Sequence, residues 1–256
     1  MIVVLLSAMA IVAYAFAAAA YRKRLPHRAF PIWRYACFAL GVTAIAVALS
    51  PWGDRASDAS FTAHMLQHLT LTLIGPPLIL LGAPLLLAAA VAPATVARTF
   101  GRLLHREIAR IVLSPVAGFF AFAAVLWLAH VTPLYELALE RPAVHVLEHV
   151  AFIGSAFLFW IWVIPSGSLP RPVAYPVRLF LPFLAIPQGA FLAVVLQSAR
   201  NVLYPHYLAT ESVARAMADQ RTAAELMWLG GGTLLFAAFV AVASEWAAHE
   251  RGAACA

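Results

Sequence analysis

Two pairs of histidines are the residues of this sequence whose types and spacing are best suited to chemistry. The first pair is His64 and His68, with Met65 beside them, and the second is His145 and His149. Residues four apart on a helix lie on one face about one turn apart, so the imidazoles of each pair could bind one metal ion. Imidazole is the commonest metal-binding side chain and suits copper, zinc and iron. We therefore interpret the two pairs together as a candidate metal site.

The composition places these histidines in a membrane protein. Of the 256 residues, 64% are hydrophobic and only 11% are charged, whereas soluble domains carry about 25% charged residues. The net charge of +6 is scattered between apolar segments, so we expect a lipid bilayer and no nucleic acid as the partner. The two cysteines, Cys37 and Cys255, indicate neither a disulfide framework nor a Cys-x-x-Cys metal site.

Hydropathy predicts an all-α protein, a polytopic bundle of seven transmembrane helices in a single domain of residues 1–256. Each span needs about 20 predominantly apolar residues, and the chain has room for seven with short connections. Gly75-Pro76-Pro77 should kink the third span, because proline lacks a backbone donor. The expected spans are about 2–20, 32–50, 61–81, 113–131, 145–164, 179–196 and 223–244.

The distribution of charge predicts how the bundle is oriented. Most of the 17 Lys and Arg fall in the tail or in the loops after spans one, three and five, so we expect the N-terminus outside and the C-terminus in the cytoplasm. With this orientation, six of the nine histidines fall at one membrane level near the outer face. They are His64, His68, His130, His145, His149 and His206.

Further residues at this level would support a metal site. Thioether sulfur favours the soft ion Cu(I), so Met65 and Met227 lead us to expect copper, with zinc as the other possibility. Carboxylates such as Glu148 and Glu225 would orient an imidazole N–H. The full set of expected supporting residues or additional ligands is Met65, Glu148, His206, Asp219, Glu225 and Met227.

Four stretches together carry a resemblance to a known family. They are Phe61 to His68 with Gly75-Pro76-Pro77 and Gly82-Ala83-Pro84; Trp127 to His130 with Pro133-Leu134-Tyr135; His145 to His149 with Phe159-Trp160; and Tyr204-Pro205 to Tyr207 with Asp219-Gln220 and Met227-Trp228. In these stretches the chain resembles the CtaG family of bacterial cytochrome c oxidase assembly factors. Glu225 departs from the family pattern, in which a small or apolar residue is common at that position.

The resemblance implies a seven-span protein of the bacterial inner (cytoplasmic) membrane that is needed to make an active haem-copper oxidase. It implies delivery of copper to the oxidase or its insertion there, with an oxidase subunit as the partner. A soluble copper chaperone is a further candidate partner, and we assign no catalytic residues. The histidine positions of the family correspond here to His64, His68, His130, His145 and His149.

We favour this non-enzymatic function, but two others fit the same histidines. One is an intramembrane hydrolase in which three histidines hold zinc and Glu148 or Glu225 activates a water molecule. The other is a haem-binding electron-transfer protein. We rank the haem protein last, because a His-x-x-x-His pair places both ligands on one helix.

Overall fold

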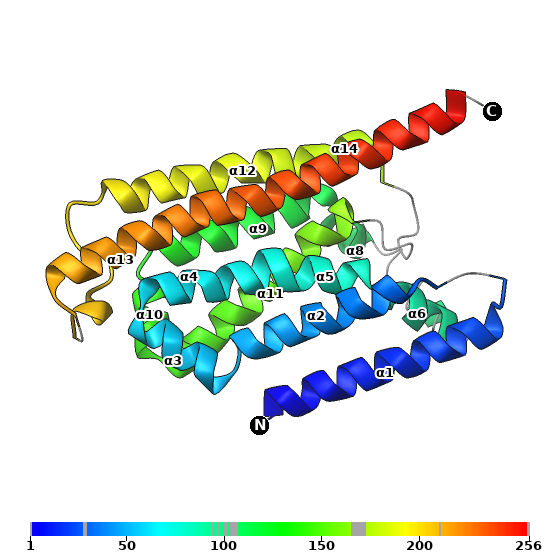
Figure 1. Cartoon of the computed structure of the whole chain (residues 1–256), viewed down its shortest axis with the longest axis horizontal. Coiled ribbons are helices and arrows are strands. Elements are labelled where there is room, and N and C mark those ends of the chain that lie inside the picture. Colours follow the sequence, from blue (N-terminus) through cyan, green and yellow to red (C-terminus); the bar gives the residue numbers. More distant parts are fainter. Residues whose placement is uncertain are drawn as a thin grey trace.

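The computed structural model of the chain describes residues 2–27, 30–93, 95–96, 98–99, 102, 107–164, 173–209 and 211–254. Every regular element in these residues is helical, and the long helices lie side by side in a bundle (Figure 1). Two short segments, η1 and η3, are π-helical, and η2 is a 3₁₀ helix. The elements are α1 (Ile2–Arg24), α2 (Ile32–Ala48), α3 (Pro51–Ala59), α4 (Phe61–Leu69), η1 (Thr70–Ile74), α5 (Gly75–Leu81), α6 (Pro84–Val91), α8 (Glu107–Val112), α9 (Pro115–Val131), α10 (Leu134–Glu140), α11 (Pro142–Val163), α12 (Tyr175–Ser198), η2 (Pro205–Ala209), α13 (Val213–Glu225), η3 (Leu226–Gly231) and α14 (Gly232–Ala254).

Five helical segments of the described chain are long and apolar enough to cross a membrane. Two bent pairs, α2 with α3 at 54° and α9 with α10 at 72°, would raise the number to seven. The all-α polytopic fold predicted from the sequence is therefore confirmed, with five to seven candidate spans, and the orientation in the membrane stays a prediction. The five segments are Ile2–Arg24, Phe61–Leu81, Pro142–Val163, Tyr175–Ser198 and Val213–Ala253.

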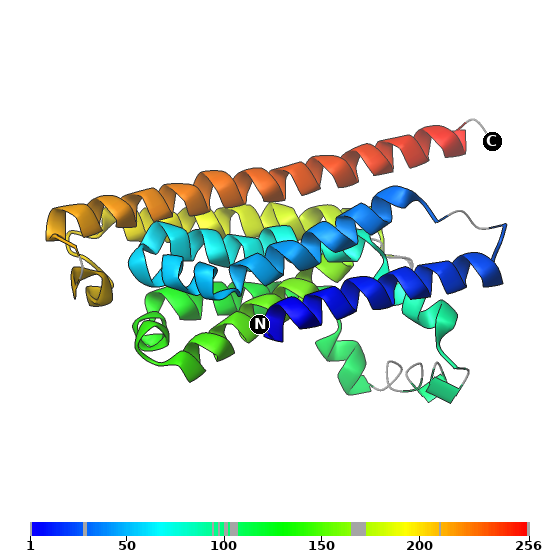
Figure 2. The same ribbon diagram turned by 60° about the horizontal axis from the view of Figure 1, so that its bottom comes forward.

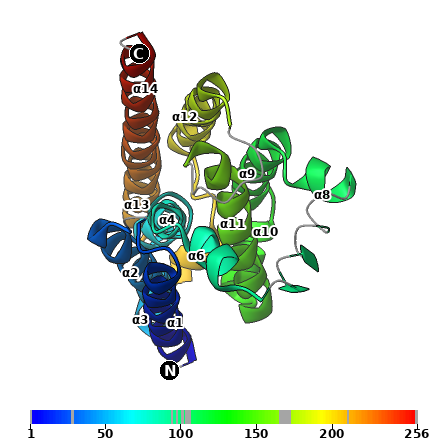
Figure 3. The same cartoon turned by 90° about the vertical axis from the view of Figure 1, so that its right-hand side faces the viewer.

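The segment Phe61–Leu81, made of α4, η1 and α5, is the centre of the bundle. In its most apolar stretch of 18 residues, 61% of the residues are buried, against 11% in the corresponding stretch of α1. In Figure 3 the other long helices surround α4. On one side it packs closely on α2 at two glycines. A Cβ atom at Gly41 would lie 2.8 Å from the carbonyl oxygen of Gly75, and one at Gly75 would lie 2.4 Å from the side chain of Ile45. Only glycine allows the backbones of these helices to approach so closely.

We expected a kink at Gly75-Pro76-Pro77, and the structure has a π-helical segment, η1, directly before the prolines within one continuous candidate span. Within η1, the backbone N–H of Gly75 donates to the carbonyl of Thr70, five residues back. Pro76 has no N–H to donate, so the carbonyl of Thr72 lacks its usual helical partner. The indole of Trp160 on α11 donates to that carbonyl instead, at 2.8 Å. The break in one helix therefore becomes a fixed contact with its neighbour.

One end of the bundle contains more helix than the sequence suggested. The expected spans left residues 51–60 and 197–222 as connections, but α3 lies in the first of these stretches and α13 begins in the second. The hydroxyl of Ser50 caps α3 by accepting from the N–H of Gly53, and Ser212 caps α13 in the same way. Local capping stabilises helices that hydropathy does not detect, because their outer faces are polar. Figure 1 shows α3, α10 and the start of α13 together at this end.

Helix α1 lies along one side of the bundle against α2 and α6 (Figure 2). A separate aromatic cluster fills this contact, in which Tyr14 stacks on Phe38 with ring centroids 3.9 Å apart. The hydroxyl of Tyr14 donates to the carbonyl of Gly82 at 2.7 Å, which ties α1 to the end of α5. Cys37 carries a free, half-buried thiol, and Cys255 lies outside the described residues.

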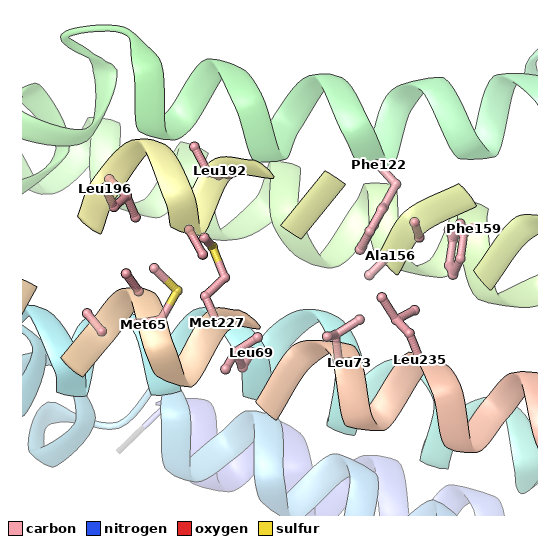
Figure 4. Packing of buried hydrophobic residues seen from close by; sticks show 14 of the residues in the cluster. Met65, Leu69, Leu73, Phe122, Ala156, Phe159, Leu192, Leu196, Met227 and Leu235 are labelled. Carbon is pink, nitrogen blue, oxygen red and sulfur yellow. The ribbon is translucent and has the colours of Figure 1, made fainter. Parts of the chain in front are cut away.

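The main apolar core lies between the central segment and helices α9, α11, α12 and α14. Figure 4 shows Met65 and Met227 in this core, pointing toward Leu192 and Leu196 of α12. Met65 is 2% exposed and Met227 is 4% exposed. These two thioethers are therefore part of the apolar packing.

Candidate metal centre

The N-terminus of α4 fixes the first histidine pair in place. The hydroxyl of Ser60 caps α4 by accepting from the N–H of Ala63 at 3.3 Å. The carboxylate of Asp219, on α13, accepts from the backbone N–H of Phe61 at 2.6 Å and from the hydroxyl of Ser60 at 3.1 Å. A carboxylate at a helix N-terminus satisfies unpaired N–H groups and complements the helix dipole. Asp219 therefore anchors the helix that carries the histidines, rather than lying among them.

His64, His68 and Glu148 form a buried group whose ligand atoms lie within 4.8 Å of one another. The Nε2 atoms of His64 and His68 are 2.9 Å apart. The Oε2 atom of Glu148, on α11, lies 3.9 Å from the first of these nitrogens and 3.7 Å from the second. Two nitrogens that each lie about 2.0–2.1 Å from one ion are separated by about 2.9–3.4 Å. A metal ion bound between the imidazoles would need only a small approach of the carboxylate.

The other three expected histidines surround this group. The ring of His145 lies 5.5 Å from that of His64, and the rings of His130 and His149 lie 6.2 Å and 5.9 Å from that of His68, centroid to centroid. The five histidines come from α4, α9 and α11. The structure thus brings the predicted set together from three helices.

Several polar atoms of this cluster are buried and have no hydrogen-bond partner among the described residues. They are Nδ1 of His68, both carboxylate oxygens of Glu148, and Nε2 of His130, His145 and His149. Buried polar groups are nearly always hydrogen-bonded, and an unpaired buried carboxylate is costly. A bound cation would supply the missing partners and compensate the charge of Glu148.

A hydrogen-bond network sets the protonation of His64. The hydroxyl of Tyr207 donates its single proton to the carbonyl of Ser57 at 3.1 Å, so toward His64 it can only accept. Nδ1 of His64, which lies 3.5 Å from this oxygen, is therefore the protonated nitrogen. The lone pair of Nε2 is left to face His68, which is the orientation that a metal ligand needs.

His130 carries its proton on the same ring nitrogen as His64. Its Nδ1 lies 2.8 Å from the carbonyl oxygen of Leu126, which can only accept, so Nδ1 carries the proton. The unprotonated Nε2 is buried and without a partner. Tyr204 also donates to the backbone carbonyl of His130, at 3.1 Å.

Three tyrosines beside the histidines were not identified as functional from the sequence. Tyr135 is fully buried, its ring lies 4.6 Å from that of His64, and its hydroxyl lies 3.3 Å from that of Tyr207. Burial raises the pKa of the Tyr204 and Tyr207 phenols above the ordinary value, so both remain protonated donors. The only signal in the sequence was that each tyrosine stands within one of the four family-like stretches.

Some of the expected supporting residues lie elsewhere. His206 is half-buried in η2, where its backbone N–H donates to Glu136 at 2.9 Å. Glu225 lies exposed at the end of α13, so it does not share the buried group. Met65 and Met227 lie in the apolar core described above.

Neither His-x-x-x-His pair leaves room for a haem between its two rings. The histidine rings pack directly on one another and on Phe152, whose ring lies 4.2 Å from that of His68. The centroids of His145 and His149 are also 4.2 Å apart. A haem held between two histidines needs room for its macrocycle between their rings. His145 and His149 leave no such space between them, and neither do His64 and His68, whose ring centroids are 4.3 Å apart.

Comparison with known proteins gives one family match and several relatives. A family model described as cytochrome c oxidase caa3 assembly factor matches residues 12–249 of the chain. An uncharacterized protein of Mycobacterium bovis is 27% identical over 251 residues, which cover 94% of this chain and 38% of that protein. An uncharacterized protein of Mycobacterium leprae is 24% identical over 239 residues, covering 90% of this chain and 36% of that protein. The chain thus spans less than two fifths of these relatives, and no solved structure matches it significantly.

Proposed function

Because the chain belongs to the family of cytochrome c oxidase caa3 assembly factors, we propose that it binds copper at the group of His64, His68 and Glu148 and passes the ion to a subunit of the oxidase. In this proposal the protein lies in the bacterial cytoplasmic membrane, with the histidines near the outer face. Copper is its cargo and not a catalytic cofactor, so the protein is not an enzyme. A soluble copper chaperone on the outer side would supply the ion.

The observation that carries this proposal is the convergence of ligand atoms in a buried cluster, several of whose polar atoms have no hydrogen-bond partner. Two imidazole nitrogens and a carboxylate oxygen converge within 4.8 Å, and the neighbouring histidines present unpartnered nitrogens. Imidazole binds copper ions well, and the three histidines around the group of His64, His68 and Glu148 would allow an ion to exchange one ligand for another. Such stepwise exchange suits a protein that must release its ion to a client.

Copper is preferred over zinc on the basis of the client. A haem-copper oxidase requires copper for assembly, whereas the two methionines that suggested Cu(I) from the sequence are packed in the apolar core. The preference therefore rests on the family and on the imidazole-rich ligand set.

Metal analysis of the protein purified in detergent tests the proposal. We expect the wild-type protein to retain copper and the His64→Ala/His68→Ala variant to lose it. The same variant should fail to restore oxidase activity in cells that lack the wild-type chain. His27→Ala/His249→Ala is the matched control, because it removes two exposed histidines outside the cluster. Wild-type protein that binds no copper, together with a cluster variant that restores full oxidase activity, would refute the proposal.

A zinc hydrolase remains the second candidate, because two histidines and a glutamate are also a ligand set of catalytic zinc sites. The arrangement gives it less support. A hydrolase also needs a base that activates the water molecule. Glu148 would already be the third ligand of the zinc ion, and Glu225, the other carboxylate considered as a base, is exposed. Zinc rather than copper in the purified protein, with turnover of a lipid amide or ester that the His64→Ala/His68→Ala variant lacks, would favour this function.

A further inference from the structure

A cavity of about 490 Å³ lies beside the histidine cluster, between the α9–α10 bend and the segment that joins α12 to η2. Its walls include His130, Glu136, Tyr204, Val195 and Leu203. His130 belongs both to this cavity and to the histidine cluster, since its ring lies 6.2 Å from that of His68. The cavity therefore reaches one of the three histidines that surround the group of His64, His68 and Glu148.

Two walls of the cavity carry polar groups without partners. Oε1 of Glu136 is fixed by the backbone N–H of His206 at 2.9 Å, while Oε2 is buried and unpaired. The imidazole of His130 is only 6% exposed, and its Nε2 is also unpaired. A carboxylate attracts a cation and an imidazole binds one, so both residues are suited to bind a cation beside the cavity.

The remaining walls have a different character. Val195 and Leu203 are apolar and partly exposed, at 47% and 42%. An ion gains nothing from contact with these side chains, so its favourable contacts lie along the polar side of the cavity. Both polar residues flank the bend between α9 and α10, with His130 in the last turn of α9 and Glu136 in the first turn of α10.

We propose that this cavity is the route by which a copper ion reaches and leaves the metal group, with Glu136 and then His130 as its successive ligands. This inference rests on the proposed function, because it concerns access to the same site. A route that serves both directions makes a specific kinetic prediction. Narrowing it slows binding and release equally, and the equilibrium affinity stays the same.

Leu203→Trp tests the route by filling the cavity with a larger side chain. The probe is Cu(I) kept reduced with ascorbate, and uptake and release are followed by competition with a coloured Cu(I) chelator. We expect both rates to fall at least about tenfold, with unchanged dissociation constant and copper content. Leu208→Trp is the matched control, because Leu208 is similarly exposed, at 39%, in the neighbouring η2 and is not among the residues that line the cavity.

Glu136→Gln tests the polar side of the route without changing its shape. The amide oxygen can still accept from His206, but the negative charge is removed. We expect slower copper uptake with the same final copper content, and no change in Glu140→Gln, one turn further along α10. Glu136→Gln also tests the route if Leu203→Trp does not fold.

The outcomes separate this inference from the proposed function. Wild-type protein that takes up no copper contradicts the proposed function. Wild-type protein that binds copper, with Leu203→Trp and Glu136→Gln loading and releasing it at wild-type rates, overturns the route alone. If copper entered beside the half-buried His145 instead, both variants would load and release copper at wild-type rates.

Discussion

The two ends of the bundle each hold a cluster of polar side chains from different helices, and the clusters differ in whether their hydrogen bonds are complete. At one end Arg178 of α12 donates to both carboxylate oxygens of Glu245 on α14, at 3.1 Å and 2.6 Å, and to the carbonyl of Val163 at 3.0 Å. At the other end Glu148 and four histidines have unpaired atoms. Polar groups that satisfy one another hold helices together, whereas groups that remain unpaired indicate a ligand.

The comparison predicts that the two clusters respond in opposite ways to loss of a charge. Substitutions at the histidine end should change copper binding with little loss of stability. Substitutions at the Arg178 end should change stability and leave copper binding intact.

Glu148→Gln should lower the copper affinity at least about 100-fold, because a neutral amide replaces an anionic ligand. The metal-free variant should unfold at the same temperature as the wild type or higher, since a buried carboxylate without a partner is lost. Chelator competition and thermal unfolding in detergent measure the two effects. A large loss of stability without a loss of affinity would make Glu148 structural and remove the contrast between the two ends.

Arg178→Met should destabilise the metal-free protein by about 2–3 kcal/mol, because it leaves the Val163 carbonyl unpaired in a buried position. The side chain of Glu245 is 46% exposed, so water compensates part of its lost pairing. Thermal unfolding in detergent gives the change in stability. The dissociation constant for copper should remain within about twofold of the wild-type value, and a greater change would couple the two ends.

Tyr207→Phe should weaken copper binding about tenfold, which is the lower end of the range for residues that orient a metal ligand. The effect is modest because the hydroxyl lies 3.5 Å from Nδ1 of His64. Tyr14→Phe is the control, since it removes a buried hydroxyl bonded to Gly82 in the other aromatic cluster. Equal copper affinities in the two variants would mean that Tyr207 does not set the orientation of His64.

Glu245→Gln should have the smallest effect, below about 1 kcal/mol of stability. The residue is half exposed, and the amide oxygen can still accept from Arg178. Thermal unfolding at low and high salt measures the contribution of the charge, which should shrink as salt rises. A loss as large as that of Arg178→Met would show that the ion pair, rather than the bond to Val163, stabilises this end.

Much of the bundle could be predicted because a membrane span leaves a simple pattern in a sequence. The central segment Phe61–Leu81 has the predicted bounds, since an apolar stretch between polar loops must satisfy its backbone within a helix. The pattern did not reveal α3 or α13, which are short or polar and depend on caps such as Ser50 and Ser212. Hydropathy detects burial in lipid and not helix formation as such.

The metal centre was likewise predictable only in part, because some of its features follow from local sequence and others depend on the tertiary structure. The spacing of His64 and His68 places both imidazoles on one face of a helix, whatever surrounds it. Met65 follows His64 directly, so its side chain points about 100° away around the helix axis. The two residues cannot both face α11, and the structure places Met65 against α12.

The sequence by itself determined that helices carry paired histidines at matching depths in an apolar chain, because helical periodicity and hydropathy are local properties. Only the tertiary structure decided that Glu148 faces the first pair, that Asp219 anchors α4 from α13, and that Glu225 faces outward. These choices depend on how each helix is rotated toward its neighbours. That rotation is set by packing between residues far apart in the chain, such as Gly41 against Gly75 and Trp160 against Thr72.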